Sequence, residues 1–89
     1  MSGIKENSND EFLNIKSDVR LDVCGLKCPH PILRSKKALA TMQSGQILHV
    51  LATDKNTTRD FSLFAKQTHN VILATQEKNG VFEFLIQRK

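Results

Sequence analysis

VRLDVCGLKCPHP, residues 19–31, takes the chain from a strand into a helix. Apolar and polar residues alternate over Val19–Val23, which predicts a half-buried strand. Gly25 permits the tight turn that follows. Pro29 suits the first turn of a helix, where its missing N–H leaves no bond unmade, and Pro31 lies in the same turn. The pattern therefore predicts a strand, a turn and a helix from Pro29 to Met42.

Cys28 lies at or next to the N-cap of this predicted helix. A cysteine there faces free backbone N–H groups and the positive end of the helix dipole, and both favour thiolate over thiol. Because thiolate is the nucleophilic form, the position predicts sulfur chemistry. The alternative is a small, partly buried side chain at a turn, but that role does not explain the prolines at 29 and 31.

Four further elements follow. Ile47–Ala52 is an almost continuous apolar run and predicts a buried strand. Thr58–Thr68 has helical spacing, and Thr57 with Asp60 three residues later resembles a capping box. Asn70–Gln76 and Val81–Gln87 predict two strands, joined by the hairpin signal Asn79-Gly80.

The element order is therefore β-α-β-α-β-β. Two helices of this length cover only one face of a four-stranded sheet, so the predicted fold is α+β, a two-layer α/β sandwich with a mixed sheet. The helical crossover predicts parallel pairing of the first two strands, and the tight turn predicts antiparallel pairing of the last two. The order of the strands in the sheet is not determined by this argument.

The 89 residues fit one small domain, which we expect at residues 17–89. Residues 1–16 are polar and predict a disordered or loosely packed tail, although Phe12, Leu13 and Ile15 are candidates to pack on the domain. The chain has neither a membrane-spanning apolar run nor a secretory h-region, which favours the cytoplasm. In that reducing compartment the two cysteines are not expected to form a structural disulfide.

Charge divides the chain unevenly. Residues 1–18 carry two basic and four acidic residues, a net charge of −2, while residues 19–89 carry eleven basic and five acidic, a net charge of +6. A basic domain attracts nucleic acid or an acidic protein surface; a soluble surface rich in lysine is the simpler interpretation. A nucleic-acid-binding or regulatory module stays an alternative, although the lack of Trp and Tyr leaves few side chains for base stacking.

Leu21-Asp22-Val23-x-Gly25-Leu26-x-Cys28-Pro29-x-Pro31 resembles the signature of the TusA (SirA-like) sulfur-carrier family, which contains a C-P-x-P motif. The likeness covers roughly residues 19–88. It continues through Lys36-Lys37-Ala38-Leu39, Ala52-Thr53-Asp54 and Thr57-Thr58-Arg59-Asp60.

The resemblance implies a two-layer fold with a four-stranded mixed sheet, and a Cys28 that accepts sulfane sulfur as a persulfide. The sulfur comes from a donor such as a cysteine desulfurase and passes to a downstream acceptor protein. Family routes include 2-thiolation of a tRNA wobble uridine, sulfur oxidation and cofactor assembly, and the residues do not select among them. The resemblance implies a sulfur-relay carrier rather than a stand-alone enzyme, with no cofactor, no direct membrane contact and only indirect contact with nucleic acid.

Other residues near the motif have weaker assignments. Gly25, Pro29 and Pro31 support the turn. Lys27, Arg34 and Lys37 are candidates to lower the pKa of the thiol or to meet an acidic partner; a solvated helix face is the alternative. Asp54 is expected to hold the loop.

Cys24 is the main departure from the family signature, at a variable position. It is either a resolving thiol that attacks a Cys28 persulfide or a strand-end cysteine with no role. A dithiol redox protein using Cys24 and Cys28 is therefore a further alternative. Two cysteines cannot complete a four-ligand zinc site, and the histidines are spread along the chain, so no metal is expected.

Overall fold

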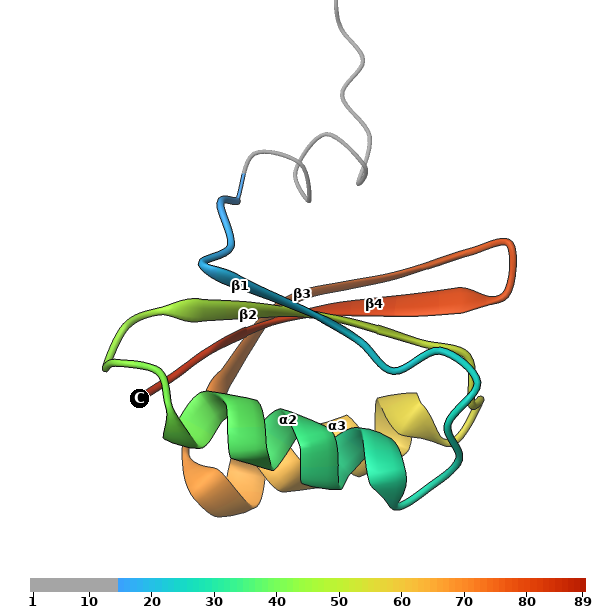
Figure 1. The fold of residues 1–89 in the computed structure, drawn as a ribbon, viewed down its shortest axis with the longest axis horizontal. Helices are drawn as coiled ribbons and strands as arrows, with labels where there is room; N and C mark the ends of the chain where they lie inside the picture. Colours follow the sequence, from blue (N-terminus) through green and yellow to red (C-terminus); the bar gives the residue numbers. More distant parts are fainter. Residues whose placement is uncertain (1–14) are drawn as a thin grey trace, which may run out of the picture.

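The computed structural model describes residues 15–89. A sheet and two helices form two layers, and both helices lie on the same face of the sheet (Figure 1). This confirms the predicted α+β sandwich. Its elements are β1 (Val19–Asp22), α2 (His30–Ala40), β2 (Ile47–Ala52), α3 (Thr57–Thr68), β3 (Val71–Lys78) and β4 (Val81–Gln87).

The sheet has the strand order β1-β2-β4-β3. β1 pairs in parallel with β2, as the helical crossover predicts, while β4 runs antiparallel to both β2 and β3. The last strand of the chain therefore lies in the interior of the sheet. β2 and β4 are the central strands, and their alternate residues supply most of the core.

The core lies between the sheet and the helices. Its sheet side consists of Leu48, Val50, Ala52, Phe84 and Ile86, and its helix side includes Leu39, Phe61 and Phe64. The ring of Phe61 is fully buried and lies 4.7 Å from the ring of Phe84, measured between centroids. This aromatic contact joins α3 to the middle of β4.

The helix starts differ in detail from the sequence prediction. α2 begins at His30 with Pro29 as its N-cap, and ends at Ala40, two residues early. The predicted capping box at α3 is wrong: Asn56 is the N-cap, and no side chain caps this helix. Thr57 is 1% exposed, so its hydroxyl needs a partner inside the protein, and it donates to the carbonyl of Asp54 at 2.5 Å.

The β3–β4 hairpin forms where the sequence predicts it. Asn79 and Gly80 have φ values of 53° and 83°, the left-handed region that a two-residue hairpin turn of type I′ requires. β4 has the predicted bounds. β3 extends to Lys78, two residues further than predicted, and contains a register shift between Ile72 and Ala74.

Most of the predicted tail, residues 1–14, lies outside the described residues. Ile15, the first residue described, is partly buried. Over residues 15–89, neither helix has the length and apolar character needed to cross a bilayer.

The buried ring of Phe61 gives a stability prediction. Phe61→Ala should lower the free energy of unfolding by about 3–5 kcal/mol, because it leaves a cavity against Phe84. Leu63→Ala, on the same helix but 53% exposed, is the matched control and should cost less than about 0.5 kcal/mol. Urea denaturation followed by far-UV circular dichroism measures both; equal losses would contradict the described core.

Candidate functional site

Cys28 lies in the connection from β1 to α2, beside the connection from β2 to α3. Because β1 and β2 are parallel, their carboxyl ends lie at the same edge of the sheet. The pairing continues one residue past β1, where the N–H of Val23 donates to the carbonyl of Leu51 at 2.8 Å. Val23 is fully buried and anchors the start of the Cys28 loop in the core.

Two side chains of the β2–α3 connection hold the Cys28 loop. The N–H of Gly25 donates to Oγ1 of Thr53 at 2.8 Å, and the N–H of Cys28 donates to Oδ2 of Asp54 at 2.8 Å. The other oxygen of Asp54 accepts the N–H of Asn56 at 3.1 Å. The hydrogen bond from Cys28 makes the largest contribution, followed by that from Asn56, and together they lower the pKa of the Asp54 carboxyl. The carboxyl is therefore ionised near neutral pH. The expected loop-holding role of Asp54 is confirmed.

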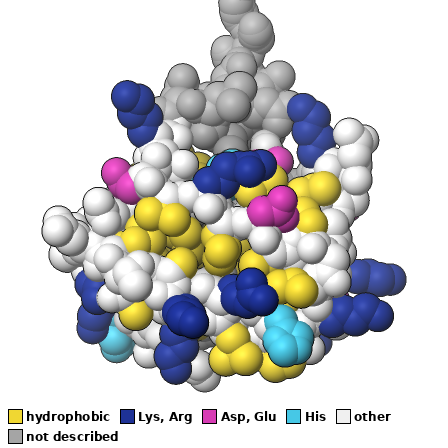
Figure 2. All heavy atoms as spheres, in the orientation of Figure 1, with side chains coloured by type: hydrophobic (Ala, Val, Ile, Leu, Met, Phe, Trp, Pro, Cys, Tyr) yellow, Lys and Arg dark blue, Asp and Glu magenta, His cyan; other side chains and the backbone are white. Residues whose placement is uncertain are grey.

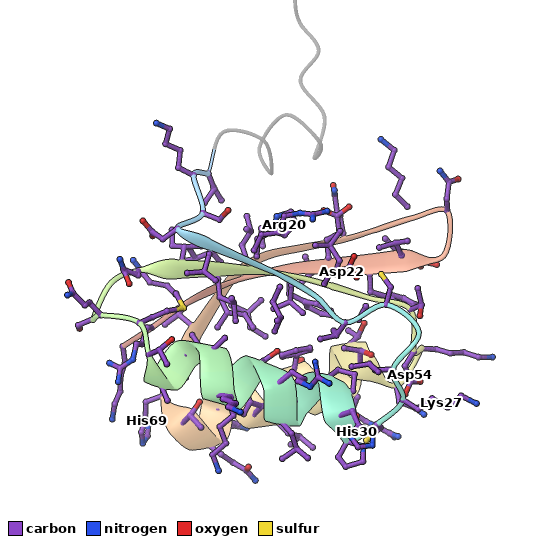
Figure 3. The ribbon with its side chains drawn as sticks, viewed as in Figure 1. Arg20, Asp22, Lys27, His30, Asp54 and His69 are labelled. Carbon is purple, nitrogen blue, oxygen red and sulfur yellow. The ribbon has the colours of Figure 1, made fainter. Side chains whose placement is uncertain are left out.

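An open groove of about 610 Å³ lies at this end of the molecule, lined by residues 25–28 and 53–56. Cys28 is exposed and carries a free thiol. The peptide bond between Cys28 and Pro29 is cis. Lys27 and Asp54 lie together at this edge, with His30 at the start of α2 (Figure 3). The sulfur of Cys28 therefore lies at an open groove and is accessible from solvent.

The pKa of Cys28 departs from the sequence prediction. The interaction of the thiol with the Asp60 carboxylate, together with desolvation and the negative charges of Asp60 and Asp54, raises the pKa of Cys28 above its ordinary value of 9.0. Only Arg59 acts in the opposite direction. The prediction of a lowered pKa at the helix N-terminus is therefore wrong.

The geometry of the helix start explains this difference. The N–H of His30 donates to the carbonyl of Lys27 at 2.9 Å and so is already satisfied. Pro29 and Pro31 have no N–H to offer. The free donors that were expected to stabilise a thiolate are thus few, whereas the carboxylates of Asp54 and Asp60 both act to raise the pKa of the thiol.

The three basic candidates are not gathered around the sulfur. Lys27 lines the groove, whereas Arg34 and Lys37 are exposed residues of α2 outside its lining. On the face shown in Figure 2, Lys and Arg side chains are scattered and do not merge into one patch. Of the three, Lys27 is the one placed to touch a molecule in the groove.

Cys24 lies in a different environment from Cys28. It is exposed and free, and its N–H donates to Oδ1 of Asp22 at 3.0 Å. Desolvation and the neighbouring Asp22 carboxylate raise the pKa of its thiol. The pKa values of the two thiols are thus raised by different carboxylates, that of Cys24 by Asp22 and that of Cys28 by Asp60 and Asp54. Gly25, which follows Cys24, has a φ of 86° and makes the turn that the sequence predicts.

The histidines are far apart. His30 is exposed at the start of α2, and His69 lies at the other end of the helix layer (Figure 3). His49 lies in β2, and its Nε2 is 2.8 Å from Oε1 of Glu83. Across residues 15–89, no three His, Cys, Asp or Glu side chains are grouped as metal ligands would be.

Sequence reasoning missed three contributors to the site. Thr53 holds Gly25, while Asp60 and Arg59 set the charge around Cys28. Asp60 was assigned to a helix cap on spacing alone, although a capping box normally has Glu or Gln at this position. The shorter Asp side chain was the one sequence signal against that assignment.

Comparisons with known proteins agree with this geometry. The sequence profile of the family described as sulfurtransferase TusA matches residues 19–88. A sulfur carrier protein TusA from Allochromatium vinosum is 54% identical over 71 residues, which cover 80% of this chain and 93% of the relative. A putative sulfur carrier protein, YrkI of Bacillus subtilis, is 42% identical over 74 residues, 83% of this chain and 99% of the relative. The crystal structure of a SirA-like protein from Desulfitobacterium hafniense has a TM-score of 0.70 at 31% identity, covering 78% of this chain and 95% of that chain.

The charges around Cys28 predict opposite effects for two neighbouring substitutions. Asp60→Asn should lower the pKa of the thiol and speed its alkylation by iodoacetamide near neutral pH, because it removes a negative charge and an anionic hydrogen-bond acceptor. Arg59→Gln should raise the pKa and slow alkylation, because it removes the cation. Alkylation rates measured as a function of pH in a Cys24→Ser background give the pKa of the Cys28 thiol in each variant. A slower reaction in Asp60→Asn would contradict the described electrostatics.

Proposed function

The chain belongs to the sulfurtransferase TusA family, and from that membership we propose that it is a sulfur carrier that holds sulfane sulfur as a persulfide on Cys28. The single observation that carries the proposal is the place of Cys28: an exposed, free thiol in the C-P-x-P motif, at an open groove. A carrier needs a sulfur that two different partner proteins can reach in turn, and an open groove meets this need.

The proposed reaction has two steps of nucleophilic transfer. The Cys28 thiolate attacks the outer sulfur of a donor persulfide, forms a new S–S bond and releases the donor cysteine as a thiolate. The thiolate of the acceptor then attacks the outer sulfur of the Cys28 persulfide, and Cys28 leaves as a thiolate. Each step breaks one S–S bond and forms another, so no external oxidant or reductant is consumed.

The loop bonds support this role because they limit where the sulfur can move. Asp54 and Thr53 hold the backbone at Cys28 and Gly25 through side-chain acceptors. A cysteine held in this way loses less conformational freedom when a partner docks. The hydrogen bonds therefore keep the Cys28 sulfur at the groove, where the sulfur of a partner can reach it.

Asp60 sets a condition on the partner. Its carboxylate favours the protonated thiol of Cys28, whereas attack on a persulfide requires the thiolate. A cationic side chain that a partner places beside Asp60 would offset this charge and release the proton. We infer that a sulfur donor, a cysteine desulfurase or another persulfide enzyme, activates Cys28 as it docks.

Persulfide formation on Cys28 tests the proposal directly. After incubation with a cysteine desulfurase and cysteine, intact-mass spectrometry should show an added mass of about 32 Da, the mass of one sulfur atom. The adduct should be absent in Cys28→Ala and present in Cys24→Ser, which is the matched control. Labelling that persists in Cys28→Ala, or that requires Cys24, would overturn the assignment.

Lys27 and Lys55 both line the groove, and Lys27, which precedes Cys28 in the chain, gives a prediction about docking. Lys27→Glu should raise the donor concentration needed for half-maximal loading severalfold, because it reverses a charge beside Cys28. Lys66→Glu, at an exposed position in the last turn of α3, is the control and should load as the wild type does. Loading rates at low and high salt measure the effect; equal behaviour of the two variants would exclude Lys27 from the contact.

A further inference from the structure

The two walls of the Cys28 groove are held in one shape by hydrogen bonds. On the first wall, the N–H groups of residues 23, 26 and 30 donate to carbonyls, and those of residues 24, 25 and 28 donate to side chains. The second wall is fixed as well, because the N–H groups of Asn56 and Thr57 both donate to Asp54. Fixed walls are typical of small-ligand sites, which are usually largely pre-formed.

The size of the groove also suits a small molecule. Its volume of about 610 Å³ falls within the range of roughly 300–1,000 Å³ that small-ligand sites have. The lining comes from two loops, residues 25–28 and 53–56, and includes the exposed free thiol of Cys28. A ligand the size of a short peptide can therefore lie in the groove with its sulfur beside Cys28.

Two cations line this groove, one from each loop. Lys27 belongs to the β1–α2 connection (Figure 3) and Lys55 to the β2–α3 connection. Both are exposed, and neither ammonium group forms a salt bridge within residues 15–89. The one carboxylate of the lining, Asp54, already accepts a backbone N–H on each of its oxygens. The lining therefore has an excess of positive charge and two ammonium groups that can meet an anion.

Charges outside the lining do not remove this excess. Arg59 and Asp60 both act on the Cys28 thiol, and their charges have opposite signs. Because these two charges oppose each other, the lysines decide which sign of ligand the groove attracts. A ligand with a carboxylate on each side of a sulfur atom would pair with Lys27 and Lys55 while its sulfur lies at Cys28.

We propose that this groove accepts sulfane sulfur directly from a small anionic persulfide, a cysteine peptide with a carboxylate on each side of its sulfur, without a donor enzyme. The Cys28 thiolate attacks the outer sulfur of the persulfide, one S–S bond forms as another breaks, and the peptide leaves as a thiolate. The proton of the persulfide stays on the transferred sulfur, and no oxidant or reductant is consumed. The inference rests on the proposed carrier function and adds a second class of donor to it.

Two matched donors test the proposal. Glutathione persulfide has both carboxylates, and the persulfide of glutathione diethyl ester is the same peptide with both carboxylates masked. In a Cys24→Ser background, glutathione persulfide should load Cys28 severalfold faster than the ester does, measured as the rate at which the adduct of about 32 Da appears. Each rate is divided by that of the same donor with 2-mercaptoethanol, a neutral thiol. High salt should reduce the difference, because the lysines are exposed.

Substitution of the two lysines separates recognition of the ligand from an effect on the thiol. Lys27→Gln/Lys55→Gln should slow loading from glutathione persulfide severalfold and change loading from the ester much less. Lys37→Gln/Lys66→Gln removes the same charge at two exposed helix positions outside the groove; it is the matched control and should keep the wild-type preference. Equal slowing of both donors in the groove variant would overturn the proposal, because the lysines would then act on the thiol alone.

Loading by a cysteine desulfurase distinguishes a failure of this proposal from a failure of the carrier function. If the desulfurase loads Cys28 but the two small donors react alike with the wild type, the small-donor proposal is wrong and the carrier function stands. If no persulfide forms on Cys28 with any of the three donors, both are wrong. The expected result is a preference for glutathione persulfide that is lost in Lys27→Gln/Lys55→Gln.

Discussion

The hydrogen bond from the N–H of Cys28 to Asp54 is the contact on which the geometry of the site depends. It joins two loops that are distant in sequence, and it forms only if β1 and β2 pair in parallel and end at the same edge. Asp54 also accepts the N–H of Asn56 at the start of α3. One carboxylate thus links the reactive loop, the central strand and the second helix, and any change in how these elements pack would move the sulfur.

The charges around Cys28 suit a carrier better than an enzyme that activates its own nucleophile. Such an enzyme lowers the pKa of its cysteine with neighbouring cations or helix donors. Here the Asp60 and Asp54 carboxylates raise it, and the nearest helix N–H is used by Lys27. A protonated thiol reacts less with oxidants and unrelated electrophiles than a thiolate does.

Local signals predicted most of the fold, and contacts between distant residues account for what they missed. The bounds of β2 and β4 and the turn at Asn79-Gly80 depend on alternation and backbone preference, which neighbouring residues fix. The position of Cys28 beside the N-cap of α2 could also be predicted from neighbouring residues, namely the prolines that follow it. Its pKa was predicted wrongly because Asp60 comes next to the thiol only after the sheet forms. The capping box failed for a similar reason, since burial turned the Thr57 hydroxyl toward Asp54.

The strand order has a consequence for how the protein is made. β4 is the last element in sequence, yet it lies between β2 and β3 and supplies the ring that stacks on Phe61. Until Val81–Gln87 has left the ribosome, β2 has no antiparallel partner and β3 has no neighbour at all. A nascent chain therefore leaves β3 and one edge of β2 unpaired until synthesis of the domain is nearly complete, and the four-stranded sheet is completed as a late event.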